Sequence, residues 1–441
     1  MNRFSSAAPQ CRPGRLLRTA CLTGVLALAG PFVAAAATNT DDDDKGAGSD
    51  PDASAAAADS PLSARFDTPE DTVVIEQEIA DMAARGGAFD PLVAEQMVSL
   101  ALAHQANNDH LAAVEVLKQV LHITRVNAGL NDLSQTGPIN LMIKSNIALQ
   151  DWEAVDGNFH LLWWLHRRNA TDDRPEFAGT ANRIGRWHLD ATSDSRDTRQ
   201  PPFMHMVRAE KAFTDAAALA ENAGPEYGGE FITALIGLAM TNLEISSYLS
   251  SSPDVRVDEF GRLVAAGAVI DFKYRMSDTY RRGRDALQKI VDFYAAQNSA
   301  LEADALALLG DWYQMHRKFE RAQTTYAQAY DIAVQRDEAD QVTERLFSSP
   351  RPLPVTLMKS EVDEQFSSED LNYVVMTFDV SPSGRASNVN IVESSPDLPT
   401  RELRNARRWA RSNRFRPRME DGKPVAATNV TLRYAIRPSD R

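Results

Sequence analysis

The sequence predicts a mainly α-helical chain that ends in a small α+β domain. From about Val73 to Val342, apolar residues recur nearly throughout at the spacing of amphipathic helices. After Leu371 the apolar spacing changes to every second residue, as in a half-buried strand, on both sides of one short helical run. With 441 residues, of which 43% are hydrophobic, the chain has room for two or three domains with buried cores.

The first 37 residues have the organisation of an export signal. Arginines precede an apolar run from Thr19 to Ala37 that closes on small residues, which is the order found in a secretory signal peptide. The run is also long enough to span a membrane. Residues 1–37 are therefore interpreted as a signal peptide or an N-terminal anchor. Because Cys11 and Cys21 both lie there, a cleaved product has no disulfide, which is compatible with the periplasm.

Residues 38–70 are predicted to form a disordered acidic linker. The run Asp41–Asp44 repels itself, and the surrounding Gly, Pro and Ala residues offer little apolar surface to bury. Residues 38–372 carry a net charge of −24, whereas residues 373–441 carry +6. An acidic body of this kind argues against nucleic acid as a partner, since nucleic-acid binding needs positive charge.

Residues 71–345 are predicted to form a helical array built from degenerate repeats. The strongest repeat lies between Asp304 and Tyr330, where small and large apolar residues follow the core spacing of a helix pair: Leu309, Gly310, Tyr313, Phe319, Ala322, Tyr326 and Ala329. This stretch resembles a tetratricopeptide repeat, in which small residues let two helices approach and aromatic residues fill the grooves. Weaker echoes align Ala113, Ala154 and Ala286 with Ala322. The polar, Arg- and Asp-rich segment from Asp172 to Pro202 is predicted to be an extended insertion or a long loop.

The last seventy residues predict strand, turn, strand, helix, loop and strand. In the first strand one face is entirely apolar, formed by Val374, Met376, Phe378 and Val380. In the last strand the apolar face is formed by Val430, Leu432, Tyr434 and Ile436. The run from Arg401 to Asn413 has helical spacing of Leu403, Ala406 and Ala410. One amphipathic helix is therefore expected to pack on a small antiparallel sheet.

A series of short sequence words in this region resembles the C-terminal domain of TonB-family energy transducers. The matching words, in chain order, are Val374–Val380, Gly384, Val389–Ser395, Phe415–Pro417 and Gly422–Val425. The resemblance implies a TonB-like domain over residues 350–441. It also implies that a partner, such as an outer-membrane TonB-dependent receptor, adds a strand to a free sheet edge. The expected edge is the last strand, Thr428–Ile436.

The partner-binding residues predicted from this resemblance lie in and near the last strand. They are Thr431, Arg433, Tyr434, Arg416 and Arg418. The same edge could join two copies of the chain, so a homodimer through the C-terminal domain is an alternative. The dense arginine series from Arg401 to Arg418 leaves two interpretations open, an anion-facing patch or the solvated face of a helix.

The sequence contains no recognisable catalytic, cofactor or metal motif. Its eight histidines show no metal-ligand spacing, and there is neither a nucleophile elbow nor a phosphate-binding loop. We therefore expect a non-catalytic periplasmic interaction protein without cofactors that binds envelope proteins. The alternatives are an energy transducer for outer-membrane transport, a structural oligomer, or an accessory subunit of an envelope enzyme. In TonB, a membrane helix couples to the motor through a Ser and a His. No His precedes His104 here, so an adaptor is favoured.

Overall fold

The computed structural model describes most of the chain after the linker. It describes residues 70–169, 174–192, 196–251, 256–257, 263–265, 268–270, 276–335, 339–354, 372–396 and 398–436. The predicted export segment (1–37), and all but the last residue of the predicted linker (38–70), lie outside these ranges. The described chain is mainly helical and ends in a small domain with a sheet, which confirms the predicted fold class.

The described residues fall into two compact units, which divide helices α7 and α8 between them. The N-terminal unit holds residues up to Pro201 together with Ala218–Phe231, and the C-terminal unit holds Pro202–Ala217 and the residues from Ile232 onward. The domain boundary predicted at residues 345–350 stays a prediction. The small C-terminal domain shares a unit with the helices that precede it.

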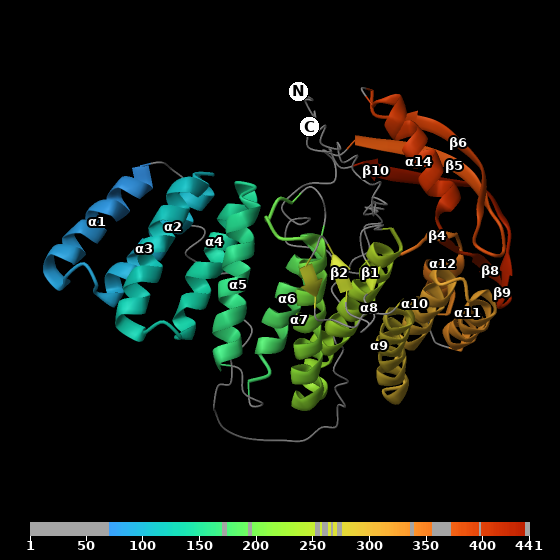
Figure 1. The fold of residues 1–441 in the computed structure, drawn as a ribbon, viewed down its shortest axis with the longest axis horizontal. Coiled ribbons are helices and arrows are strands. Elements are labelled where there is room, and N and C mark those ends of the chain that lie inside the picture. The colour runs from blue at the N-terminus through green and yellow to red at the C-terminus, as the bar shows by residue number, and fades with distance from the viewer. Residues whose placement is uncertain are drawn as a thin grey trace, which may run out of the picture. The chain divides into compact units, whose positions relative to one another are not determined.

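In the N-terminal unit each helix packs against the next helix in the chain (Figure 1). The elements are α1 (Glu70–Gly86), α2 (Pro91–Ala106), α3 (His110–Ala128), the 3-10 turn Leu133–Gln135, α4 (Thr136–Ala148), α5 (Trp152–Asn169) and α6 (Phe177–Asp190). Packing between sequence neighbours is typical of helical repeat arrays, in which each unit buries its apolar face on the adjacent one.

Among the described residues the same turn closes four of the helix pairs. Asn108, Gln150, Asn298 and Arg317 each have a φ between 50° and 58° and lie two residues after the last residue of a helix. In each turn the next residue donates its N–H to a carbonyl five residues back, as Asp109 does to His104 over 2.8 Å, a common way to satisfy a helix end. Ala113 and Ala322 each lie five residues after the residue with positive φ in their turn, and in the second turn this position is held by Val155. The predicted alignment of Ala154 with Ala113 and Ala322 was therefore shifted by one residue.

The predicted long loop between Asp172 and Pro202 contains a helix. Helix α6 buries residues at helical spacing, including Phe177, Ala181 and Ile184. The long-loop prediction was wrong because polar residues of this segment, such as Asn182 and His188, are themselves buried in α6, and no residue of the helix is exposed. A polar composition therefore does not show that a segment lies at the surface.

After α6 the chain continues through the α7–α8 pair, which the two units share, and then through a second helical stretch. The elements are α7 (Pro202–Ala223), the 3-10 turn Pro225–Tyr227, α8 (Gly228–Ser251), the short strands β1 (Arg256–Val257), β2 (Leu263–Ala265) and β3 (Ala268–Ile270), then α9 (Met276–Ala296), α10 (Glu302–Met315), α11 (Phe319–Val334) and α12 (Ala339–Phe347). Among the described residues one helical stretch, Pro225–Ser250, has the length and mean hydropathy (1.2) of a membrane span, and half of its window is buried.

Helices α10 and α11 pack as the sequence suggests. Tyr326 lies directly against Gly310, where a Cβ atom would come within 2.5 Å of the ring. Ala322 and Ala329 are fully buried in the same helix pair. A small residue facing an aromatic ring lets the two helices approach closely. The local geometry of this pair therefore follows the predicted steric pattern, while its assignment to the tetratricopeptide family stays a prediction.

The C-terminal domain is a three-stranded antiparallel sheet covered on one face by a helix (Figure 1). The strand order is β10 (Ala427–Ile436), β5 (Asn372–Val380) and β6 (Ala386–Ser394), and α14 (Thr400–Ser412) packs on β5 and β6. Its core contains all four apolar residues predicted for β5, together with Ala406 and Ala410 of α14. The predicted apolar residues of β10 also pack against this core.

Two short ladders complete the domain. Strand β4 (Arg351–Pro352) pairs with β7 (Phe415–Arg416), and β8 (Arg418–Glu420) pairs with β9 (Lys423–Val425). Because β4 follows α12 directly, the first ladder joins the end of the helices to the sheet domain.

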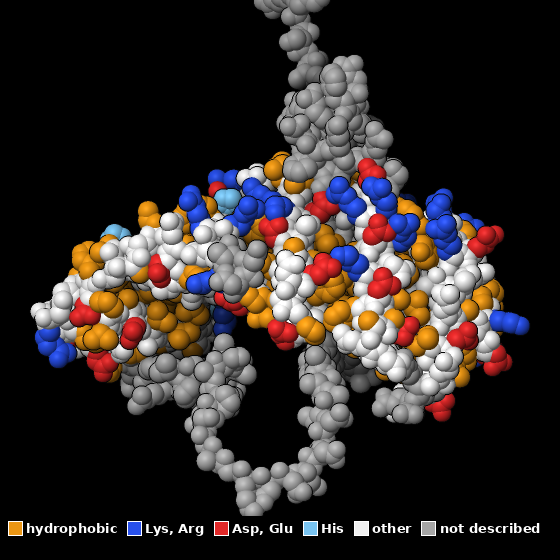
Figure 2. Space-filling model, turned by 90° about the horizontal axis from the view of Figure 1, so that it is seen from below, with side chains coloured by type: hydrophobic (Ala, Val, Ile, Leu, Met, Phe, Trp, Pro, Cys, Tyr) orange, Lys and Arg blue, Asp and Glu red, His pale blue; other side chains and the backbone are white. Residues whose placement is uncertain are grey.

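On the face drawn in Figure 2, acidic side chains of the described residues are scattered among basic and hydrophobic ones and do not form one continuous acidic surface.

Candidate functional site

The C-terminal domain is docked on helices α10, α11 and α12 through strands β7, β9 and β8 respectively. At the centre of this contact, Arg416 of β7 pairs with Asp311 of α10. The guanidinium donates from Nε to Oδ1 over 2.9 Å and from Nη2 to Oδ2 over 2.5 Å. Both side chains are almost completely buried, at 3% and 4% exposure. Such a bidentate pair satisfies both charges at once and fixes their orientation.

The buried ion pair is completed by a tyrosine and a backbone carbonyl. Tyr326 of α11 donates its hydroxyl to Asp311 over 2.8 Å, and Arg416 reaches the carbonyl of Leu346 at 3.4 Å. Burial lowers the pKa of Arg416, but the neighbouring Asp311 carboxylate outweighs burial and the pKa is raised. Burial, followed by the same carboxylate, raises the pKa of Tyr326. Arg416 is therefore charged and Tyr326 neutral over the physiological pH range.

A glycine turn and a glutamine make a second contact beside this pair. Gln314 of α10 donates its amide to the carbonyls of Ser383, at 2.8 Å, and Phe415, at 3.3 Å. Gly384 has a φ of +71°, and a Cβ atom there would overlap both the Phe415 carbonyl and the Gln314 amide. Only glycine combines this conformation with such a close approach. The β5–β6 turn is thus shaped to receive α10.

Strand β10 is an edge of the three-stranded sheet. It pairs with β5 over Ala427 and Val430–Ile436, with a register shift between Ala427 and Val430. Within the described sheet its other side has no neighbouring strand. An edge strand presents alternate N–H and C=O groups that another extended segment can pair with. The edge position predicted for Thr428–Ile436 is thus present in the structure.

The five residues predicted to bind a partner have different surroundings. Thr431 and Arg433 are exposed on the open face of the sheet, where Arg433 lies 4.2 Å over the ring of Tyr373. Tyr434 points the other way and packs on Trp409 of α14, with 4.7 Å between ring centroids. Tyr434 is half-buried and packs against the core of the domain.

The two predicted arginines lie outside β10. Arg418 of β8 is partly exposed and pairs with Glu420. Arg416 is buried and forms an ion pair with Asp311. It therefore does not belong to the surface where it was predicted to lie. The role of Asp311, Tyr326 and Gln314 in holding the C-terminal domain was not predicted, because these residues lie in helices that were predicted to form a separate domain.

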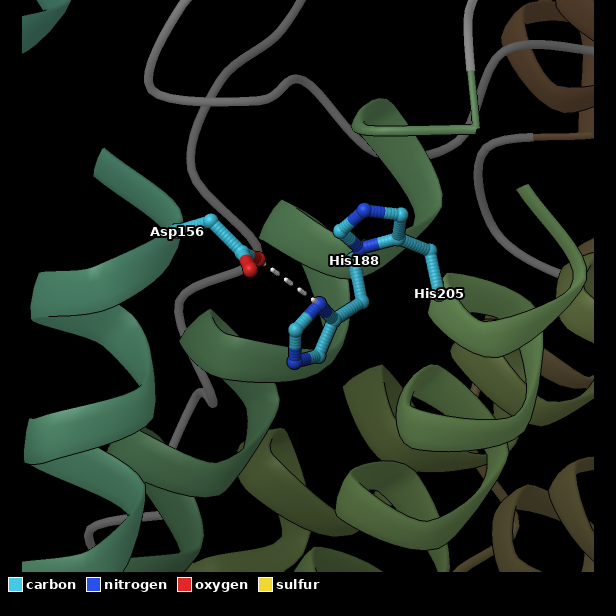
Figure 3. A group of neighbouring side chains, drawn as sticks. All are labelled: Asp156, His188 and His205. Atoms are coloured by element: carbon cyan, nitrogen blue, oxygen red, sulfur yellow. Dashed lines mark ion pairs between the residues drawn. The ribbon is translucent and has the colours of Figure 1, made fainter. Parts of the chain in front are cut away.

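The N-terminal unit contains a buried polar pair (Figure 3). Nδ1 of His188 on α6 lies 3.8 Å from Oδ1 of Asp156 on α5. The same carboxylate oxygen accepts a hydrogen bond of 3.1 Å from Nε1 of Trp187. Trp187 in turn stacks on Phe159 with 5.3 Å between ring centroids. The Asp156–His188 pair is surrounded by aromatic side chains between α5 and α6. Because the two residues are 32 positions apart in the chain, no local sequence pattern predicts that they meet.

The C-terminal part of the chain matches a known family. Residues 372–436 match the family model described as Gram-negative bacterial TonB protein C-terminal. This match spans β5 to β10, including α14, and confirms the resemblance seen in the sequence. No curated protein sequence matches the chain. The segment is thus a TonB-type C-terminal domain, a non-catalytic domain type of the Gram-negative periplasm that takes part in contacts between envelope proteins.

Proposed function

We propose that this chain is a non-catalytic envelope adaptor whose TonB-type domain binds an extended segment of a partner protein along β10. The observation that carries this proposal is the pairing of β10 on one side only in the described sheet. β10 is ten residues long, and its outer backbone groups can form a further antiparallel or parallel ladder. Backbone pairing of this kind gives affinity for any extended segment, and side chains then select among partners.

The side chains of β10 divide into two groups for this role. Thr431 and Arg433 face the open side of the sheet, where they contact a bound segment and its neighbours. Tyr434 contributes indirectly, because its packing on Trp409 keeps the edge strand attached to the core. Arg418 is near the surface, whereas Arg416 acts only by holding the domain on the helices.

The docking of the domain supports an adaptor over a free transducing arm. The Asp311–Arg416 pair and the Gln314 contacts join the domain to α10, so that its binding edge is held on the helical scaffold. The helices then serve as a second surface for envelope partners. The candidate partners of the edge are outer-membrane receptors of the TonB-dependent class. Energy transduction remains the alternative function, and it requires an inner-membrane anchor within residues 1–37.

The test is site-specific photocrosslinking in a Gram-negative host that expresses the full chain. A photoreactive residue replaces Thr431 on β10. The matched control replaces Val392, which is 65% exposed on β6 at the opposite edge of the sheet. We expect outer-membrane receptors to be captured from position 431 and not from position 392.

Two results would contradict the proposal. Equal capture from both positions would show that the contact does not involve the β10 edge. Capture of only a second copy of this chain from position 431 would show that the edge serves dimerisation. Light scattering of the purified protein would then report a dimer in place of a monomer.

A further inference from the structure

A groove on the opposite side of the C-terminal domain is lined by four arginines. It lies between α14 and β6 and has a volume of about 730 Å³. Its lining is formed by residues of these two elements: Val389, Asn390, Arg404, Arg407, Arg408, Arg411 and Ser412. All four arginines are exposed, and the lining contains no acidic side chain.

The helical register places the arginines on one side of α14. The opposite side buries Ala406 and Ala410 against the sheet. Positions 404, 407, 408 and 411 are three or four residues apart, which puts neighbouring side chains within reach of each other. Like charges at this spacing repel one another and destabilise the helix slightly. In the described part of the chain, no acidic side chain offsets this repulsion by an ion pair with any of the four.

We propose that this groove binds an anion that carries several phosphate groups. A guanidinium donates two parallel hydrogen bonds to a phosphate, and several guanidiniums on one face bind a multiply charged anion together. Asn390 and Ser412 add neutral donors at the edge of the groove. The volume is that of a small-molecule site and exceeds the needs of a single ion.

The composition of the groove favours a phosphate compound over an acidic protein. Stable protein contacts depend on aromatic or aliphatic anchors at their centre, whereas Val389 is the one apolar side chain that lines the groove. The groove lining also lacks an exposed apolar side chain that could insert into a bilayer, so a lipid would be held by its headgroup alone. The phosphate groups therefore belong to a soluble molecule or to a phospholipid headgroup.

The groove is separate from the proposed strand-binding edge. It borders β6, while β10 lies on the other side of β5. A partner segment on β10 and an anion on α14 do not compete for the same residues. The inference consequently stands or fails independently of the proposed function.

The test measures binding of tripolyphosphate to the full chain by calorimetry at low ionic strength. Arg404→Ala combined with Arg408→Ala is expected to weaken binding by at least about tenfold, because two charge-assisted contacts are lost. The matched control combines Arg85→Ala with Arg321→Ala, which removes the same charge from exposed positions on α1 and α11, outside the groove. This control is expected to bind like the unmodified chain.

A second arm identifies the source of the phosphate. Cosedimentation is measured with phosphatidylcholine vesicles that contain about one third phosphatidylglycerol. Binding to these vesicles that depends on Arg404 and Arg408 supports a lipid headgroup, and binding to tripolyphosphate alone supports a soluble ligand. Three outcomes overturn the proposal. They are no binding to either probe, an equal loss in the control variant, and tighter binding of a hexa-aspartate peptide than of tripolyphosphate.

Discussion

The arginines of the C-terminal domain have two opposite surroundings. Arg416 is buried and paired with Asp311 at hydrogen-bond distance. The arginines of the groove, including Arg404 and Arg408, are exposed, and no acidic side chain among the described residues pairs with them. A buried charge without its partner is costly, whereas an exposed charge is solvated by water. The difference separates an arginine that holds the fold together from arginines that are free to bind a ligand.

The largest effect is expected from breaking the buried pair. Asp311→Asn leaves the guanidinium of Arg416 buried without a counter-charge and should lower the free energy of unfolding by about 3–5 kcal/mol. Urea denaturation followed by tryptophan fluorescence measures this loss. The double variant Asp311→Leu with Arg416→Met removes both charges and should lose much less. A loss below about 1 kcal/mol in Asp311→Asn would show that the pair is hydrated in solution.

The next effect concerns the turn that receives α10. Gly384 and Gly422 have the same φ of +71°, but a Cβ atom at Gly422 would meet no atom closer than 3.7 Å. Alanine at either position costs about 1–2 kcal/mol of backbone strain. At Gly384 it also displaces Gln314 and Phe415, so Gly384→Ala should be clearly the more destabilising. Equal denaturation midpoints for the two variants would mean that the turn does not contact α10.

A smaller effect is expected from the tyrosine that completes the ion pair. Tyr326→Phe removes one hydroxyl donor from Asp311, while both bonds from Arg416 remain. The expected loss is about 1.5 kcal/mol, the low end of the range for a hydrogen bond to a charged group, because Asp311 keeps its partner Arg416. Thermal unfolding compared with the unmodified chain measures it. A loss as large as that of Asp311→Asn would indicate that the ion pair does not survive without the tyrosine.

The smallest effect is expected in the groove. Arg404→Ala with Arg408→Ala changes exposed side chains and should alter the free energy of unfolding by no more than about 0.5 kcal/mol. Any change should be a slight gain, because repulsion along α14 is relieved. The same urea denaturation measures it. A loss above about 1 kcal/mol would show that these arginines support the fold, contrary to the contrast with Arg416.

Local sequence patterns predicted the C-terminal domain well. The period of two in β5 and β10 identified the core faces, because alternate side chains of a strand point to opposite sides of the sheet. The helical spacing of Ala406 and Ala410 likewise placed α14 on that core. The prediction failed where polar residues are buried, as in α6, and where alignment depended on one small residue, as at Ala154.

The site was predicted only in part. The order of the sequence words was enough to identify a TonB-type domain and to place its last strand at an edge. No local feature distinguishes Arg416 from Arg414 or Arg418, which alternate with it along the same segment. Arg416 was consequently predicted to lie at the surface, together with Arg418.

The sequence by itself determined which segments become helices and strands and which of their faces are apolar, since both depend on residues a few positions apart. The tertiary structure alone decided the role of each arginine. Asp311 lies 105 residues before Arg416 in the chain, and only the docking of β7 on α10 brings the two together. Long-range pairing of this kind leaves no periodic trace, because the energy of a buried charge depends on the groups that surround it in space.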